Sequence, residues 1–335
     1  MSRVYILGAG ASAFAGYPSA RGLWSFVRQH APVDGDLQTV IRRLAKKFQP
    51  RRVDDPDLES LFTLLDLRLL LALRAWKGKT DWMYRRVRFV AALVKAFLDH
   101  QRLFQHFFWD HRTNVLPLNQ SVVDRVYRDW QGCLSLDDTI ISFNWDILHE
   151  SLLYRTNKWH PFIGYGFQVQ DIADPGRPSM LMVKLHGSAN WQQHEKTDII
   201  HLTTPFDFFP QLGTTFLRTN LSPADRRLDE SLVIPTYLKK ISDNPILVRL
   251  WALAASRLRL ADEIIAIGFS LNPADQAASS LISEAILNSQ KKPKLTVVNC
   301  NPTNWESFCK GLGVQPDYAK MKFEEWLSRL PQAAA

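Results

Sequence analysis

The chain has few cysteines and no long apolar stretch free of charge. Its 335 residues include three cysteines, Cys133, Cys300 and Cys309, and no C-x-x-C pair, so they build neither a disulfide framework nor a four-thiolate zinc site. The most apolar stretch, residues 61–73, is interrupted by Asp66 and Arg68, which argues against a membrane span. The amino terminus has only a short apolar run before a glycine turn, unlike a signal peptide. We therefore expect a cytoplasmic protein without a metal centre.

Acidic residues are scarce in the first part of the chain. Residues 1–130 carry 21 Lys and Arg against 12 Asp and Glu, whereas residues 131–335 carry 20 against 21. The net charge of +8 at pH 7 therefore originates in the first part. Hydrophobic residues make up 46% of the chain and charged residues 22%, proportions that exclude disordered and fibrous proteins.

Glycine nearly disappears between residues 23 and 130, where Leu, Phe, Arg and Trp recur at helical spacing. This pattern predicts at least three helices and no strand, with Asp57 and Thr80 as helix N-caps. Outside this segment, short runs that are apolar on both faces predict the strands of a helix-covered parallel sheet. They are residues 3–7, 139–143, 181–185, 232–234, 263–267 and 295–298.

Helical patterns separate several of these strands, at residues 245–260, 273–289 and 322–330. Strands that alternate with helices predict an α/β fold, here an open, doubly wound, mostly parallel and Rossmann-like sheet. We expect residues 1–22 and 131–335 to form this NAD-binding catalytic domain. Residues 23–130 are expected to form an all-α insertion after the first strand and helix.

A glycine-rich turn, Gly8-Ala9-Gly10-Ala11-Ser12, follows the first predicted strand. Glycines let a backbone approach a phosphate closely, and a following helix directs N–H groups and a positive dipole end at it. A tight turn that binds nothing is the alternative. No second strand ending in an acidic residue follows about 20 residues later, which disfavours a standard Rossmann oxidoreductase.

Four further polar motifs follow the later strands. They contain Asn144 and Asp146 in SFNWD, His186 in KLHGSANW, Gly268 and Ser270 in GFSL, and Asn299 and Asn301 in NCNP. Side chains at the carboxyl ends of parallel strands point into the crevice where doubly wound sheets bind ligands. Each motif also has a structural interpretation: Asp146 suits a helix N-cap, and a lone histidine usually serves as a hydrogen-bonding residue. Five such motifs in one chain favour a site.

In this order the motifs resemble the sirtuin-like family. The resemblance rests on Gly8–Ser12 with Gly16 and Pro18, on Asn144 and Asp146, on His186 and Gly187, on Gly268 and Ser270, and on Asn299 or Asn301. It does not extend to residues 23–130. The four-cysteine zinc module of protein-deacylating sirtuins is missing, and Pro18 is followed by Ser-Ala-Arg instead of Asp-Phe-Arg. The FNWD and KLHGSANW forms, with the helical insertion, look like bacterial sirtuin-like proteins of anti-phage defence that hydrolyse NAD⁺.

The resemblance implies an NAD⁺ glycohydrolase, or NADase, that releases nicotinamide and ADP-ribose. By resemblance, Asn144 orients the ribose and a water, Asp146 holds the nicotinamide carboxamide, and His186 is the base. The residue types suit this chemistry, because cleavage passes through an oxocarbenium-like transition state and histidine titrates near neutral pH. The N–H groups of Ala9, Gly10, Ala11 and Ser12 are expected to bind the diphosphate. Gly268, Ser270 and Asn299 are expected to line the adenosine side. Arg21 is either a phosphate contact or a solvated residue.

Two other functions stay open, an NAD-dependent protein deacylase or ADP-ribosyltransferase and a non-catalytic module that senses NAD⁺ or ADP-ribose. An unrestrained NADase would poison its own cell, so we expect control by homo-oligomerisation or by a separate partner. The resemblance suggests a HerA-type ATPase or a short Argonaute. Basic residues cluster at 42–52 and 85–88. They fit a solvated helix face or an assembly surface better than direct binding of nucleic acid.

Overall fold

The structure is a computed structural model of the whole chain. It describes residues 2–30, 35–54, 56–71, 88–100, 120–169, 172–193, 200–202, 232–233, 241–242, 244–273 and 275–330. The expected N-cap at Thr80 and the basic cluster at 85–88 lie outside these residues, except for Arg88.

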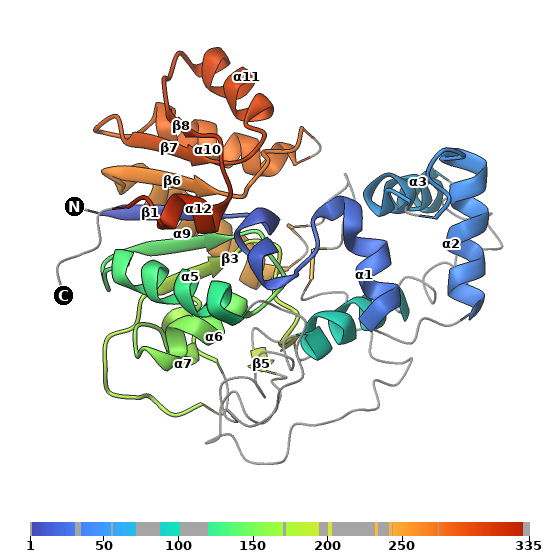
Figure 1. Cartoon of the computed structure of the whole chain (residues 1–335), viewed down its shortest axis with the longest axis horizontal. Helices are drawn as coiled ribbons and strands as arrows, with labels where there is room; N and C mark the ends of the chain where they lie inside the picture. The colour runs from blue at the N-terminus through green and yellow to red at the C-terminus, as the bar shows by residue number, and fades with distance from the viewer. Residues whose placement is uncertain are drawn as a thin grey trace.

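Six parallel strands form one open sheet in the order β3-β2-β1-β6-β7-β8 (Figure 1). The strands are β1 (Arg3–Leu7), β2 (Thr139–Ser142), β3 (Leu181–Lys184), β6 (Glu263–Ile267), β7 (Lys294–Val298) and β8 (Asp317–Ala319). Ile6 of the central strand pairs with Ile141 on one side and Ala266 on the other, and all three are buried. This order is that of dinucleotide-binding sheets, and it confirms the predicted fold class.

Five of the six predicted strands are confirmed to within one residue at each end. The exception is residues 232–234, where Leu232 forms only an isolated antiparallel bridge with Gly187. The sequence pattern does not predict the edge strand β8 or the antiparallel pair β4 (Trp191–Gln193) and β5 (Ile200–Leu202). Each of these strands has three residues, too few to show an apolar pattern.

Helices cover both faces of the sheet. They are α5 (Gln120–Cys133), α6 (Leu148–Arg155), α7 (Pro161–Gly164), α9 (Pro245–Leu260), α10 (Gln276–Leu287), α11 (Thr303–Leu312) and α12 (Phe323–Leu327). Trp130 of α5 meets Tyr5 of β1 edge-on at 4.9 Å and Phe323 of α12 at 5.2 Å between ring centroids, so α5 and α12 share one face. Helices α9 and α10 pack together, and the right-handed rule for crossovers between parallel strands predicts that they lie on the other face.

The helical patterns predicted in this part of the chain are confirmed, with shifted ends in two cases. Helix α9 spans the predicted 245–260, and its N-cap Asn244 accepts hydrogen bonds from the N–H groups of Ile246 (3.0 Å) and Leu247 (3.3 Å). Helices α10 and α12 are shorter than the predicted 273–289 and 322–330.

The described residues of 23–130 form helices and no strand, as predicted, and residues 49–57 connect two of these helices. Helices α1 (Leu23–His30), α2 (Gly35–Phe48) and α3 (Leu58–Leu71) lie beside the sheet, and residues 88–100 form a further helix (Figure 1). The N-cap role of Asp57 is confirmed, because its Oδ1 accepts the Glu59 N–H at 3.1 Å. Phe26, Phe62, Phe89 and Phe97 belong to a second core, which also includes Ala189 of the HGSAN segment.

Helix α5 runs through the predicted boundary between residues 130 and 131. Its Trp130 belongs to the core of the sheet, whereas its Val123 belongs to the second core. The insertion therefore packs directly on the sheet domain. The division into one domain of residues 1–22 and 131–335 and a second of residues 23–130 stays a prediction.

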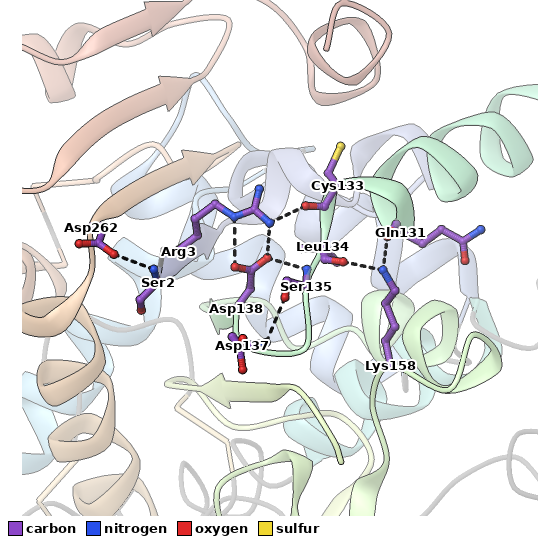
Figure 2. A network of polar contacts seen from close by, with 10 residues as sticks. All are labelled: Ser2, Arg3, Gln131, Cys133, Leu134, Ser135, Asp137, Asp138, Lys158 and Asp262. Atoms are coloured by element: carbon purple, nitrogen blue, oxygen red, sulfur yellow. Dashed lines mark hydrogen bonds and ion pairs between the residues drawn. The ribbon is translucent and has the colours of Figure 1, made fainter. Parts of the chain in front are cut away.

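A polar network fastens the edge at which the strands begin, here called the amino edge (Figure 2). Arg3 donates from Nε to Asp138 Oδ1 at 3.1 Å, and from Nη2 to Asp138 Oδ2 at 2.7 Å and to the Cys133 carbonyl at 2.8 Å. The Ser2 N–H donates to Asp262 at 2.8 Å, and Lys158 donates to the Leu134 carbonyl at 2.5 Å. These bonds join the beginnings of β1, β2 and β6 to the end of α5.

Candidate functional site

The motifs predicted from the sequence gather at the opposite edge, where the strands end, here called the carboxyl edge. Strand order reverses between β1 and β6, which follow each other in the sheet but not in the sequence. In open α/β sheets a ligand binds outside the carboxyl ends of the strands at this reversal. Residues 8–12 follow β1 and residues 268–271 follow β6, so these two loops flank the reversal.

Three glycines bring these two loops into backbone contact. The Gly10 N–H donates to the Gly268 carbonyl at 3.0 Å, and a Cβ at Gly10 would lie 2.7 Å from the Gly268 Cα. A Cβ at Gly8 would lie 2.5 Å from the Phe269 Cα. Gly268 has a φ of +58°, and a Cβ there would lie 2.3 Å from the Ala11 nitrogen. The close approach of the loops to each other thus explains the glycines without any ligand.

The chain after Gly8 differs from the expected turn and helix. Three short 3₁₀ turns follow, Ala9–Ala11, Ala13–Ala15 and Ala20–Gly22, and the first α-helix begins only at Leu23. The expectation of an α-helix dipole directed at this loop is therefore wrong. The N–H groups of Ala11 and Ser12 donate to the Gly8 and Ala9 carbonyls at 2.9 and 3.2 Å, because the chain turns back on itself here. Among the described residues, the Ala9 N–H donates to no backbone carbonyl.

Asn144 joins the loop after β2 to the glycine turn. Its Nδ2 donates to the Gly8 carbonyl at 2.9 Å and to Ser12 Oγ at 3.2 Å, and its own N–H donates to Ser142 Oγ at 3.2 Å. Asn144 is 8% exposed and Ser12 is fully buried. Since both bonds use Nδ2, the amide oxygen points away from the glycine turn.

Asp146 lies just before helix α6, but the N-cap residue of this helix is Ile147, so the predicted N-cap is off by one position. Asp146 Oδ1 accepts the Leu148 N–H at 3.1 Å, and its main-chain carbonyl accepts a hydrogen bond from Lys184. Lys184 also pairs with Glu150 at 2.6 Å, and both side chains are almost completely buried. Burial raises the pKa of Glu150, while the neighbouring Lys184 opposes this shift. The sequence analysis gave Lys184 and Glu150 no role; the structure shows that they fix the backbone of the FNWD loop.

His186 lies at the end of β3 against two aromatic rings and a carboxylate. Its ring meets Phe143 edge-on at 5.1 Å, and Phe143 stacks on Phe269 at 4.4 Å with an interplanar angle of 8°. His186 Nε2 lies 3.3 Å from Asp275 Oδ2, and both side chains are largely buried. The sequence analysis missed Asp275, although an acidic residue before a helical pattern was a signal for an N-cap. The loops after β2, β3 and β6 therefore meet around His186.

The predicted adenosine-side residues connect the loops after β6 and β7. Asn299 Nδ2 donates to the Phe269 carbonyl at 3.1 Å, and its Oδ1 accepts the Asn301 N–H at 3.0 Å. Asn301 in turn accepts the Thr303 N–H at 3.2 Å just before α11, whose N-cap is Pro302. Ser270 is exposed on the same loop.

Pro18 and Arg21 lie on the connection to the helical insertion. Pro18 is partly buried and Arg21 is exposed within the turn Ala20–Gly22. The preceding Tyr17 is buried, and it stacks on Phe97 of the insertion at 5.7 Å. These positions connect the glycine turn to the insertion.

No group of three or more His, Cys, Asp or Glu side chains in the described ranges is placed to hold a metal ion. Among the helices that the structure describes, none is both long and apolar enough to span a bilayer.

Comparison with known proteins gives a weak likeness to Sir2 enzymes. No protein-family model and no curated protein matches the chain. A Sir2 homologue mutant in complex with ADP-ribose matches with a TM-score of 0.41 and 16% identity over 97% of this chain and 88% of that one. A Sir2 complex with a peptide and NAD⁺ matches with a TM-score of 0.39 and 15% identity over 98% of this chain and 91% of that one. At scores and identities this low, the likeness assigns neither family nor activity.

Proposed function

We propose that the chain is an NAD⁺ glycohydrolase, which cleaves NAD⁺ to nicotinamide and ADP-ribose at the carboxyl edge. The observation that carries the proposal is the arrangement around the strand-order reversal. There Asn144 is bonded to Gly8 and Ser12 of the glycine turn, and His186 is held against Phe143 of the neighbouring loop. A glycine turn, a fixed amide and a histidine thus lie on adjacent loops, an arrangement that supports the proposal.

The reaction needs little from the protein beyond orientation and one base. The bond between the ribose carbon and the nicotinamide nitrogen breaks, and its electron pair leaves with nicotinamide, which becomes neutral. A water oxygen forms the new bond to that carbon, and the water proton goes to His186. Because the leaving group is neutral, no general acid is required. The oxocarbenium-like transition state instead needs a fixed ribose and diphosphate.

Each site residue has a role that its contacts allow. Asn144 orients the ribose and the water through its amide oxygen. The second carboxylate oxygen of Asp146 accepts from the nicotinamide carboxamide while Oδ1 holds the start of α6. The turn Ala9–Ser12 binds the diphosphate, with the Ala9 N–H as its donor in this conformation, and Gly268, Ser270 and Asn299 line the adenosine side.

The proposal includes control by self-association or by a separate polypeptide, and a role as an NAD⁺-depleting effector of anti-phage defence. The exposed basic residues Arg42, Arg43, Lys46 and Lys47 of α2 support a surface for such assembly. Charge of one sign on a helix face speeds the encounter with an acidic partner.

The experiment is to incubate the purified full chain with NAD⁺, with and without an ATPase or Argonaute partner, and to follow nicotinamide by chromatography. Asn144→Ala and His186→Ala are each expected to lower the rate by about 10²- to 10⁴-fold, the range for loss of a general base or orienting group. Asn288→Ala, at an exposed position at the end of α10, is the matched control and should keep the full rate.

Three results would contradict hydrolysis as the function. Absence of nicotinamide under every condition removes the NADase proposal. Release only when a peptide or protein acceptor is added favours a deacylase or ADP-ribosyltransferase. Tight binding of NAD⁺ or ADP-ribose without turnover favours a sensing module.

A further inference from the structure

Asp275 brings a second ionisable side chain to His186 from a distant part of the chain. The two residues are 89 positions apart in the sequence, and their side chains are 10% and 7% exposed. The distance from His186 Nε2 to Asp275 Oδ2 is 3.3 Å. A carboxylate this close and this shielded from water interacts with an imidazole more strongly than a surface pair does.

The carboxylate of Asp275 is fixed by its place at the start of helix α10. Its Oδ1 accepts the Ala278 N–H at 3.4 Å, and its main-chain N–H donates to the Asn272 carbonyl at 2.7 Å. The Asp275 carbonyl accepts from the Ser279 N–H at 3.1 Å. One carboxylate oxygen therefore caps the helix while the other faces the imidazole.

The imidazole is held from its other side as well. Phe143 meets the His186 ring edge-on and is itself stacked on Phe269. The His186 carbonyl accepts the Val233 N–H at 3.0 Å, which fixes the backbone beneath the ring. Rotation of the ring away from Asp275 would disturb the edge-on contact with Phe143.

We propose that Asp275 is the positioning residue of His186, an inference that rests on the proposed function. The Asp275 carboxylate lies 3.3 Å from Nε2 without hydrogen-bond geometry in this structure. Its negative charge favours the tautomer with the proton on Nε2 and the lone pair on Nδ1. Nδ1 then takes the water proton, and Asp275 stabilises the positive charge that forms on the ring. Asp275 keeps its negative charge throughout.

Asparagine separates this role from helix capping. Asn and Asp are about equally good N-caps, so Asp275→Asn keeps the cap of α10 and removes only the charge. We expect kcat for nicotinamide release to fall about 10- to 100-fold, with the KM for NAD⁺ and the midpoint of thermal unfolding unchanged. The matched control is Asp57→Asn, the same exchange at the N-cap of α3, which should leave kcat unchanged.

A second measurement tests the pairing without turnover. The imidazole ¹⁵N signals of His186, assigned by their absence from His186→Gln, should show a protonated Nε2 in the wild type and change in Asp275→Asn. If the wild type releases no nicotinamide, the proposed function is wrong. The NMR result alone then shows whether Asp275 and His186 interact.

Unchanged kcat in Asp275→Asn, or His186 signals identical to those of the wild type, would overturn the proposal. Should Asp275→Asn fail to fold, Asp275→Ser takes its place in both measurements. Its hydroxyl also caps a helix but is too short to reach the ring.

Discussion

The two edges of the sheet use buried polar groups in different ways. At the amino edge, Arg3 and Lys158 donate to the Asp138 carboxylate or to main-chain carbonyls of adjacent segments (Figure 2). At the carboxyl edge, Asn144 and His186 connect loops that follow different strands. The first edge ties strand beginnings together, whereas the second holds an amide and an imidazole beside the strand-order reversal. Buried polar residues thus mark a site only where they are arranged around a place for a ligand.

The largest effect is expected from Gly268→Ala at the carboxyl edge. Its Cβ would lie 2.3 Å from the Ala11 nitrogen, at a residue with φ of +58°. The steric overlap and the left-handed backbone together should lower the free energy of unfolding by about 4 kcal/mol. The overlap should also separate the two loops and so abolish nicotinamide release. Urea unfolding measures the change in the free energy of unfolding, and the nicotinamide assay measures the loss of activity.

Gly313→Ala is its matched control, because Gly313 has φ of +66° and no atom within 4 Å of its Cβ position. Left-handed backbone alone should cost about 1 kcal/mol there. Equal destabilisation by the two variants would show that the loops do not need their close contact.

The second largest effect is expected in the pH dependence of the free energy of unfolding, and it depends on the buried His149 of helix α6. Burial, the largest cause, lowers the pKa of His149 to about 4, although the nearby Asp146 opposes the shift. The unfolded chain binds the proton first as the pH falls, so the folded state gains stability as the pH rises from about 4 to 6.5, by about 3 kcal/mol.

In His149→Leu this gain should shrink by about the same 3 kcal/mol, measured by urea unfolding at pH 4.5 to 7. An unchanged pH dependence in the variant would mean that His149 does not make this edge acid-sensitive.

A smaller effect is expected from Asp138→Asn at the amino edge. The variant loses the charged partner of Arg3, so the free energy of unfolding should fall by about 2 kcal/mol. Nicotinamide release by the folded variant should stay at the wild-type rate. The neighbouring Asp137 is exposed, and Asp137→Asn should change neither quantity. Loss of activity in Asp138→Asn without loss of stability would break the distinction between the edges.

The sequence pattern predicts most of the sheet, because buried parallel strands are apolar on both faces. Residues 3–7 and 263–267 illustrate this, with strand ends that agree to the residue. The order of motifs likewise predicts that residues 8–12 and 268–271 flank one edge. These features depend on local composition and on general rules of chain topology.

What the sequence pattern does not predict depends on contacts between distant residues. Asp275 reaches His186, and Lys184 reaches Glu150, only once the loops and helix α6 are in place. No local pattern reveals the 3₁₀ turns after Gly8 or the contact of Gly10 with Gly268. Asn301, a candidate ligand residue at its strand end, accepts the Thr303 N–H at the start of helix α11.

Hydrogen exchange of the full chain, with and without saturating ADP-ribose, tests the central claim most directly. ADP-ribose is the product of the proposed reaction and is not consumed. The account predicts slower exchange in residues 8–16, 142–148, 186–190 and 268–273 at the carboxyl edge, and unchanged exchange in residues 133–138 and 258–263 at the amino edge. Slower exchange confined to the amino edge, or no change at either edge, would contradict it.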